Sequence, residues 1–238
     1  MTFSPATEMP KILEELDRSI FTKDPVIALV PAQLLWAAAQ FASTDECKEL
    51  LTTVCINTKV HDSDCYLEIA STDGHRLFKA VIPYSEHFFA YSDLIDKEKG
   101  FKVFAKPLKK AVSYAQYAVI RKSGQVDFMG GKKSTTDLLC SVNASAREWQ
   151  DATYPNYNQL IPKSFGTNTE KPIAFNAGYL SDFCKVVSKL SPNGTVKMQR
   201  NSDNTPAVFD CDYCLIDERG FDLPSIKLEC LIMPVVIR

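Results

Sequence analysis

The sequence lacks an excess of basic residues. Its 27 lysines and arginines are outnumbered by 29 aspartates and glutamates, which gives a net charge of −2. Proteins that only coat nucleic acid usually carry a clear basic excess. Any contact of this chain with DNA must therefore come from a local basic face on an otherwise neutral or acidic body.

Long apolar runs are also missing. No run approaches the roughly 20 residues that a membrane-spanning helix needs. The N-terminal residues 1–5 lack the basic start and the apolar core of a signal peptide. The eight cysteines mostly sit inside apolar runs, where a reduced thiol packs as a small hydrophobic group. These features predict a reduced, cytoplasmic protein without a membrane segment.

Apolar residues are present in a proportion that supports a packed core. They make up 45% of the 238 residues, and charged residues make up 24%. A chain of this length and composition can form one large domain or two small ones, and bulk disorder is not expected.

A strand, a helix and three further strands follow one another from residue 26. Residues 26–30 are typical of a short strand, and Pro31 then opens a helix at a position that proline favours. The residues that mark one face of this helix are Leu34, Leu35, Ala38 and Phe41. Three β segments follow, at residues 51–58, 65–70 and 76–82. A turn at residues 72–74 makes the last two segments a hairpin.

The same order recurs twice. The second unit has β segments at residues 102–105, 118–121, 125–129 and 137–142, with a helix after Pro107. The third has β segments at 172–175, 196–199, 207–211 and 228–232, with a helical stripe over 180–190. Three units at intervals of roughly 70 residues indicate internal repetition. The expected fold class is α+β, with β-α-β-β-β units whose helices cover one face of antiparallel sheets.

Three local patterns suggest other chemistry. Asp73 and His75 could form an acid–base pair of a hydrolase, but no nucleophile is placed by the sequence and a glycine turn separates them. Cys211 and Cys214 form a single CxxC pattern, which is a weak zinc signal without a second pair. Residues 129–135 resemble a phosphate loop only loosely, because the spacing of the glycines and the lysine is wrong. We therefore expect no metal, no cofactor and no catalytic site.

Four motifs together resemble the bacterial DNA sliding clamp, the β subunit of DNA polymerase III. Residues 71–77, Ser-Thr-Asp-Gly-His-Arg-Leu, are similar to the Ala-Thr-Asp-Gly-His-Arg-Leu signature of the clamp's middle domain. Residues 154–162 are similar to the linker that closes that domain. Residues 175–182 and 231–235 are similar to the start of the clamp's last unit and to its C-terminal tail. The resemblance covers roughly residues 26–238 and includes the repeated β-α-β-β-β unit.

The resemblance implies a surface pocket for short peptides of the polymerase, the clamp loader and repair proteins. Its apolar members would receive a hydrophobic anchor, while Arg76, His75 and Asn176 would orient the peptide backbone. The complete set that the resemblance implies is Leu51, Thr72, Gly74, His75, Arg76, Leu77, Pro155, Leu160, Asn176, Tyr179, Pro206, Leu231, Met233, Pro234 and Val235.

The resemblance also implies contact of the inner helices with double-stranded DNA through phosphates, without sequence reading. The basic residues in suitable positions are Lys106, Lys109, Lys110, Lys185 and Lys189. The first helix, over residues 33–43, carries no basic residue, which departs from what a DNA-lined hole requires. The alternative is that these lysines form a solvated helix face.

The expected organisation is an arm at residues 1–25, a domain of two units at 26–162 and a half-domain at 163–238. A clamp chain has six units, and only three are counted here. An unpaired third unit is expected to leave sheet edges and an apolar helix face exposed. Either two chains pair there or the arm covers it, and four chains would together supply the twelve units of a ring.

The sequence therefore predicts a non-catalytic, oligomeric processivity factor that tethers polymerase and other replication or repair proteins to DNA. A second hypothesis is a clamp-derived decoy or regulator that binds the same partners without encircling DNA. The hydrolase that uses Asp73 and His75 is the third.

Overall fold

The computed structural model describes residues 24–61, 64–85, 88–90, 92–109, 115–130, 137–161, 174–190, 196–199, 206–213 and 226–234. The first unit comprises β1 (Val26–Pro31), α3 (Ala32–Phe41), β2 (Thr53–His61), β3 (Asp64–Thr72) and β4 (Arg76–Pro83). The second comprises β6 (Phe101–Phe104), α4 (Ala105–Leu108), β7 (Tyr117–Arg121), β8 (Gln125–Met129) and β9 (Leu138–Asn143). The third comprises α5 (Ala177–Leu190), β10 (Lys197–Gln199), β11 (Ala207–Tyr213) and β12 (Ile226–Ile232). Shorter elements are η1 (Glu46–Thr52), β5 (Phe89–Ala90), η2 (Ser92–Leu94), η3 (Arg147–Trp149) and η4 (Tyr157–Gln159).

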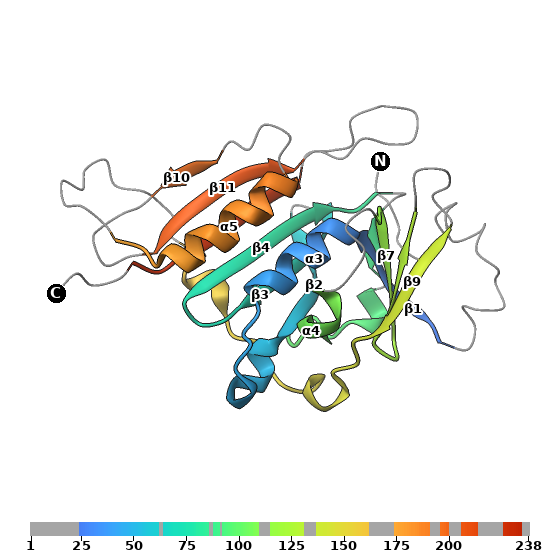
Figure 1. Ribbon diagram of the computed structural model, residues 1–238. Helices are drawn as coiled ribbons and strands as arrows, with labels where there is room; N and C mark the ends of the chain where they lie inside the picture. The colour runs from blue at the N-terminus through green and yellow to red at the C-terminus, as the bar shows by residue number, and fades with distance from the viewer. Residues whose placement is uncertain are drawn as a thin grey trace.

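The first two units exchange their first strands. β1 pairs with β7 of the second unit, and β6 pairs with β2 of the first, both antiparallel. The result is a five-stranded sheet in the order β5-β1-β7-β8-β9 and a longer sheet that starts from β6-β2-β3-β4. Each unit thus completes the sheet of the other (Figure 1), and one continuous apolar core joins their described residues and also includes residues of the third unit.

The third unit joins the first through its last strand. β12 pairs antiparallel with β4, so that β10, β11 and β12 extend the longer sheet to seven strands. The expected exposure of an apolar helix face in this unit is wrong. Phe183, Val186, Val187 and Leu190 of α5 are buried, because the helix packs on the sheet and beside α3. Of the predicted first strand of this unit, the described residues contain only an isolated bridge at Ala174.

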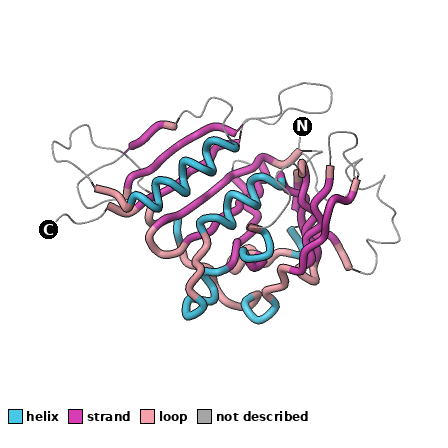
Figure 2. Tube along the Cα trace, viewed as in Figure 1, coloured by secondary structure: helices cyan, strands magenta, loops and turns pink. Residues whose placement is uncertain are grey.

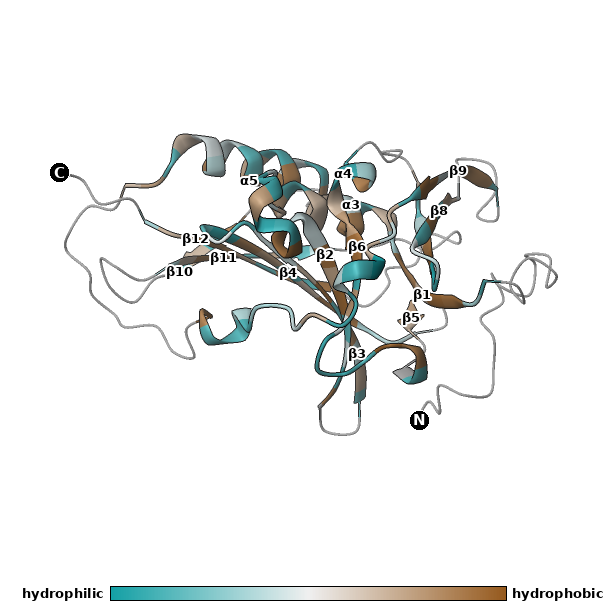
Figure 3. Ribbon diagram, turned by 90° about the horizontal axis from the view of Figure 1, so that it is seen from below, coloured by the Kyte–Doolittle hydropathy of each residue, from teal (hydrophilic) through white to brown (hydrophobic). Residues whose placement is uncertain are grey.

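The helices form one layer on the sheets. Figure 3 shows α3, α4 and α5 on the same side of the strands, and Figure 2 shows α3 and α5 running along the longer sheet. α3 lies in the middle of this layer and contacts both α4 and α5. Seven of its ten residues are buried, and none is charged. The expected α+β class, with helices on one face of antiparallel sheets, is confirmed.

Three expected boundaries differ from the structure. Pro31 ends β1 and caps α3 instead of forming its first turn. Residues 46–52 form a 3-10 helix, so β2 begins at Thr53 and not at residue 51. Asp24 and Pro25, expected in the arm, bond to the turn after β7: Ser123 N–H donates to Asp24 Oδ1 at 3.0 Å and Lys122 N–H to the carbonyl of Pro25 at 2.9 Å.

No helix in the described part of the chain is long and apolar enough to cross a membrane.

Candidate functional site

The turn between β3 and β4 is fixed by side chains of its own sequence. Asp73 Oδ1 accepts hydrogen bonds from the N–H groups of His75 and Arg76 at 2.9 and 3.0 Å. Thr72 Oγ1 accepts from the N–H of Gly74 at 3.0 Å and donates to the carbonyl oxygen of Arg76 at 2.7 Å. Gly74 has a φ of +93°, which residues with a Cβ rarely adopt. The Thr-Asp-Gly sequence therefore determines the shape of this turn.

The C-terminal tail lies beside this turn. Leu77 of β4 is directly opposite Leu231 of β12, and Val208 of β11 is opposite Leu231 on its other side. Beyond the strands, Met233 N–H donates to the carbonyl oxygen of His75 at 2.9 Å. The two segments that the sequence predicts as walls of one pocket are thus neighbours in the fold.

An apolar cluster forms on the face of the sheet opposite to the helices. Its buried members are Cys55, Ala70, Leu77, Tyr154, Tyr157, Val208 and Leu231, with Leu50 and Ile161 packed against them. The strands supply the floor of the cluster, and residues 154–161 lie across it. This segment keeps the floor out of water, so the floor itself is not open to a ligand.

The accessible apolar surface is the rim of this cluster. Leu160 and Met233 are 52% and 38% exposed, and Pro155 is also exposed. Pro206, the residue before β11, and Pro234 of the tail are half-buried. Exposed large apolar side chains of this kind are the usual contacts of a hydrophobic peptide anchor.

Residues 154–161 are attached to the sheet by a buried polar contact. The Tyr157 hydroxyl donates to Glu68 Oε1 at 2.6 Å. Burial, with the nearby charge of Glu68, raises the pKa of Tyr157, so the phenol remains a hydrogen-bond donor. Lys79 lies within 3.5 Å of Glu68 and 3.4 Å of Glu229. The buried carboxylate of Glu68 therefore has both a donor and a cation as partners.

Arg76 connects three parts of the chain. Its Nε donates to Asp73 Oδ2 at 2.9 Å, and its Nη1 donates to Asp182 Oδ2 of α5 at 2.8 Å. Its Nη2 donates to the carbonyl oxygen of Gln40, near the end of α3, at 3.2 Å. The side chain is only 10% exposed. The planar guanidinium suits this set of acceptors, because it offers several donors in a fixed geometry.

Aromatic rings enclose the same guanidinium. Its central carbon lies 5.3 Å from the ring centre of Phe41 and 4.9 Å from that of Tyr179. The ring of His75 stacks on that of Tyr179, with ring centres 6.1 Å apart. Burial would raise the pKa of Asp182, but hydrogen bonds from Arg76 and Lys185 outweigh it and hold that pKa below its usual range. The contacts of Arg76 are therefore largely within the chain.

Asn176 acts as the cap of α5. Its side-chain oxygen accepts from the N–H of Gly178 at 2.8 Å and from that of Tyr179 at 3.4 Å. Side-chain oxygens at this position satisfy the free N–H groups of a helix start. The cap fixes the first turn of α5. Tyr179 belongs to this turn and contacts His75 and Arg76.

These contacts argue against the hydrolase hypothesis. Both carboxylate oxygens of Asp73 are engaged, one by the turn N–H groups and the other by Arg76. The His75 ring lies exposed against Tyr179. A general base needs a carboxylate or another group that orients its imidazole, and Asp73 is occupied elsewhere.

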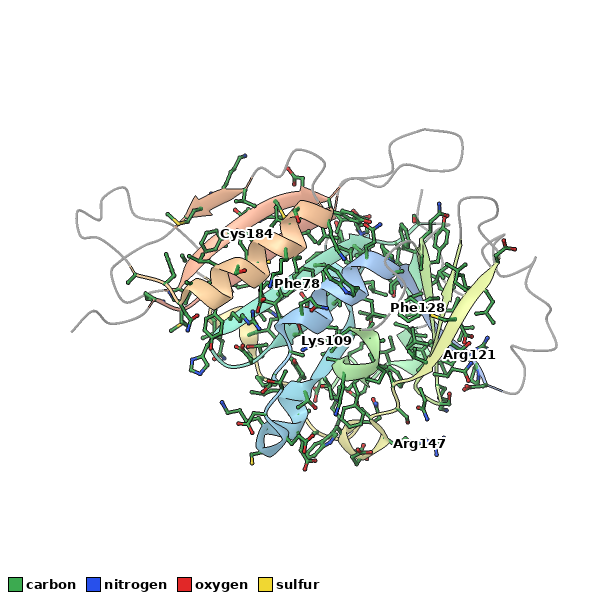
Figure 4. The ribbon with its side chains drawn as sticks, in the orientation of Figure 1. Phe78, Lys109, Arg121, Phe128, Arg147 and Cys184 are labelled. Carbon is green, nitrogen blue, oxygen red and sulfur yellow. The ribbon has the colours of Figure 1, made fainter. Side chains whose placement is uncertain are left out.

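The described lysines among those predicted to face DNA lie on the helical side of the molecule, and they differ in exposure and in partners. Lys106 is exposed, and Lys185 is 70% exposed but lies 3.2 Å from Asp182. The Lys189 ammonium lies 4.1 Å from the ring centre of Trp36. Lys109, labelled in Figure 4 beside α3, is half-buried, and burial together with the charge of Arg76 lowers its pKa. Lys110 lies outside the described residues.

A cavity of about 590 Å³ opens on this helical side. The loop after α3, η1, the end of β6 and α4 line it, and its walls include Phe104, Lys106 and Lys109 together with Glu46 and Glu49. Two carboxylates therefore sit in the same wall region as two of the predicted DNA-facing lysines. This reduces the local positive field that phosphates would meet.

The sequence reasoning missed several residues of the site. Leu50, not Leu51, packs against the apolar cluster, and both residues lie in the 3-10 helix η1 instead of in a strand. Val208 and Asp182 were not among the predicted pocket residues, since their partners lie far away in the sequence. The alternating pattern of β11 was the only signal for Val208. Val235, the last predicted pocket residue, lies outside the described part of the chain.

Comparison of the sequence with known proteins finds similarity to a bacterial sliding clamp. No protein-family model matches the chain. The beta sliding clamp of Synechocystis sp. is 24% identical over 262 residues, an alignment that covers 82% of this chain and 60% of that protein. The chain thus spans well under the full length of this curated relative.

Solved structures with a similar fold are also bacterial sliding clamps. The DNA polymerase III β subunit of Caulobacter crescentus superimposes with a TM-score of 0.57 and 18% identity over 89% of this chain and 66% of that one. A sliding clamp from Bartonella birtlesii, bound to griselimycin, gives a TM-score of 0.55 and 18% identity with the same coverage. The resemblance carried by the four motifs is confirmed: this chain has the fold of the bacterial DNA polymerase III β sliding clamp.

Proposed function

We propose that the chain is a non-catalytic, sliding-clamp-like module that binds short peptides of DNA polymerase, clamp-loader and repair proteins. The observation that carries the proposal is the meeting of the Thr72–Leu77 turn with the Leu231–Pro234 tail over one apolar cluster. The exposed rim of Pro155, Leu160 and Met233 offers a hydrophobic peptide its first contacts.

The proposed division of roles within the pocket differs from the one expected at first. Leu160 and Met233 contact the peptide directly. Arg76 stabilises the pocket without contacting the peptide, because its N–H groups bind the turn, α3 and α5 and so hold them together. His75 remains available at the surface to contact the peptide backbone.

The experiment is a titration of a fluorescent clamp-binding peptide, followed by anisotropy. Leu160→Ala and Met233→Ala are each expected to weaken binding by about tenfold, the usual effect of truncating an important anchor contact. Val60→Ala is the matched control, because Val60 is 67% exposed on another part of the sheet. Absence of binding by the unmutated protein, or equal losses in all three variants, would exclude the pocket.

DNA binding is the second part of the proposal. Lys106, Lys109, Lys110, Lys185 and Lys189 would meet phosphates, and the affinity for duplex DNA would then fall steeply with salt. An affinity that does not change between low and high salt would exclude phosphate contacts by these lysines.

A decoy or regulator is the alternative function, and the charge of the helical side favours it. α3 carries no charge, Lys189 is engaged by Trp36, and carboxylates lie near Lys106, Lys109 and Lys185. A primer-extension assay separates the two functions. A processivity factor lengthens the products of the polymerase, whereas a decoy that occupies clamp-binding peptides shortens them.

A further inference from the structure

One lysine of the described chain is sheltered from water without a partner for its charge. The described lysines that are buried or half-buried are Lys79, Lys99, Lys102 and Lys109. Lys79 and Lys99 form ion pairs with carboxylates. The Lys102 ammonium donates to the carbonyl oxygens of Gly100 and Gln150 at 3.2 and 3.0 Å. Within the described residues, the ammonium of Lys109 has no hydrogen bond and no ion pair.

The carboxylates around Lys109 are bound by other cations. The charges of Asp73 and Asp182 act on Lys109, but Arg76 already binds both carboxylates, at 2.9 and 2.8 Å. Lys185 binds the second oxygen of Asp182 at 3.2 Å. Arg76 itself repels the Lys109 ammonium. Burial, and then this repulsion, lower the pKa of Lys109 below its ordinary value of 10.5.

A lysine in such surroundings has more of the chemistry of an amine. The ammonium form cannot attack an electrophile, because its nitrogen has no free electron pair. Desolvation and a neighbouring cation both favour the neutral form, and this is how proteins activate lysine as a nucleophile. Lys109 therefore combines a sheltered position with nucleophilic character.

The Lys109 side chain, labelled in Figure 4, lines the cavity of about 590 Å³ on the helical side. The other lining residues are Ser43, Thr44, Glu46, Glu49, Thr52, Phe104, Lys106 and Pro107. Phe104 and Pro107 offer apolar surface to a carbon chain. The two carboxylates of η1 oppose the entry of an anionic reagent, so the cavity suits a reagent whose reactive end is neutral.

We propose that Lys109 is a site of acylation, at which a thioester in this cavity transfers its acyl group to the side-chain nitrogen. The neutral amine attacks the thioester carbonyl carbon. The new N–C bond forms and the C–S bond breaks. The proton that the nitrogen loses leaves with the sulfur as a thiol, and nothing is oxidised or reduced. The product is an uncharged amide, so the cation beside Arg76 disappears. This reaction does not depend on peptide or DNA binding.

The first test compares the rates at which individual lysines are modified. The full chain is incubated with S-acetyl-N-acetylcysteamine, a neutral thioester, and peptide mass mapping follows each lysine. At pH 7.5, Lys109 is expected to be acetylated several times faster than Lys59, an exposed lysine that does not line the cavity. The Lys109 rate should also level off before pH 10.5 is reached, because its pKa is lowered.

Two results of this experiment would overturn the proposal. One is a Lys109 rate equal to or below that of Lys59 at pH 7.5. The other is a Lys109 rate that still rises tenfold per pH unit at pH 10.5, since this is the behaviour of an amine whose pKa is not lowered.

The second test asks whether the thioester reaches Lys109 through the cavity. Thr44 is an exposed lining residue, so Thr44→Trp fills space there without entering the core. This variant is expected to slow the acetylation of Lys109 several-fold and to leave Lys59 unchanged. Thr44→Ser keeps the space open and is the matched control. Equal Lys109 rates in the two variants overturn the proposal that the cavity holds the donor.

Discussion

Arg76 shows how one side chain of a recognition motif can serve the fold. Its guanidinium binds two carboxylates and a helix-end carbonyl, and it lies between the rings of Phe41 and Tyr179. Removal of one partner from a buried ion pair is costly, because the remaining charge is left without compensation. The motif therefore influences the stability of the whole helical layer.

Arg76→Lys is expected to lower the free energy of unfolding by about 2–4 kcal/mol. A lysine cannot reproduce the planar fork, and the partly exposed Asp182 reduces the loss below that of a fully buried pair. Urea unfolding followed by circular dichroism measures the change. The control is Lys185→Ala, whose exposed pair with Asp182 should contribute less than about 1 kcal/mol. Equal effects of the two substitutions would contradict this role of Arg76.

Asp127 is expected to make the protein sensitive to acid. Burial would raise the pKa of Asp127, but hydrogen bonds from Ser141, Gln125 and Arg121 outweigh it and lower the pKa below the ordinary value of 3.8. The unfolded chain therefore takes up a proton before the folded one does. The stabilisation is complete above pH 3.8 and is lost as the pH falls through the lower pKa of the folded state.

Unfolding free energies between pH 2 and pH 7 test this prediction. In that range, Asp127→Asn is expected to be less stable than the unmutated protein near neutral pH and to lose less stability in acid. Asp151→Asn is the control, because the Asp151 side chain is fully exposed. A variant with the same acid dependence as the unmutated chain would show that Asp127 is not responsible.

The sequence predicted the signature residues but not their partners. The Thr72–Leu77 turn could be recognised because its turn chemistry is local. The bond between Arg76 and Asp182 joins residues 106 positions apart. No periodic pattern encodes such a pair, so Arg76 was assigned to the peptide when most of its donors serve the chain itself.

At the scale of elements, the apolar face of α3 was predictable and its full burial was not. The helical spacing of Leu34, Leu35, Ala38 and Phe41 indicated one buried stripe. Ala37 and Ala39 are also buried, because α4 and α5 pack beside the helix. The absence of charge in this helix, first interpreted as a departure from a DNA-lined surface, has a structural cause in these neighbours.

Residues 154–161 are the element on which the proposed pocket most depends. Tyr157→Phe removes the bond to the buried Glu68 and is expected to cost about 1.5–3 kcal/mol of stability, as for other bonds to a charged group. Peptide affinity should also fall, because Pro155 and Leu160 belong to the same segment. Urea unfolding and the anisotropy titration measure the two effects.

Tyr154→Phe is the matched control for that segment. The Tyr154 hydroxyl donates to the carbonyl of Thr53 at 3.3 Å, a longer bond to a neutral acceptor. Its loss is expected to cost about 0.5–1.5 kcal/mol. A larger effect of Tyr154→Phe than of Tyr157→Phe would contradict the importance given to Glu68.

At the scale of the whole molecule, the third unit depends on the first. β12 completes the border of β4 along six paired positions, and α5 is tied to the turn through Arg76. The sequence indicated the number of units and their order. It could not indicate this pairing, because strand partners far apart in sequence are chosen by the packing of both faces.

Residues 26–161 and residues 174–234 are therefore expected to unfold in one transition. Circular dichroism and hydrogen exchange of β4 and β12 should report the same unfolding free energy, because β12, the Arg76–Asp182 bond and the packing of α5 on α3 join the third unit to the first. Two separate transitions, with β12 exchanging before β4, would show that the third unit is an independent domain.

The contact of Lys189 with Trp36 gives the molecule an internal optical probe. Trp36 is one of only two tryptophans, and an ammonium group from α5 lies over its ring. Indole emission responds to a nearby charge and to hydration, so its colour and intensity depend on whether α5 remains on α3. With Trp149 replaced by phenylalanine, fluorescence of the single remaining indole would follow the detachment of the third unit in real time, without any added dye.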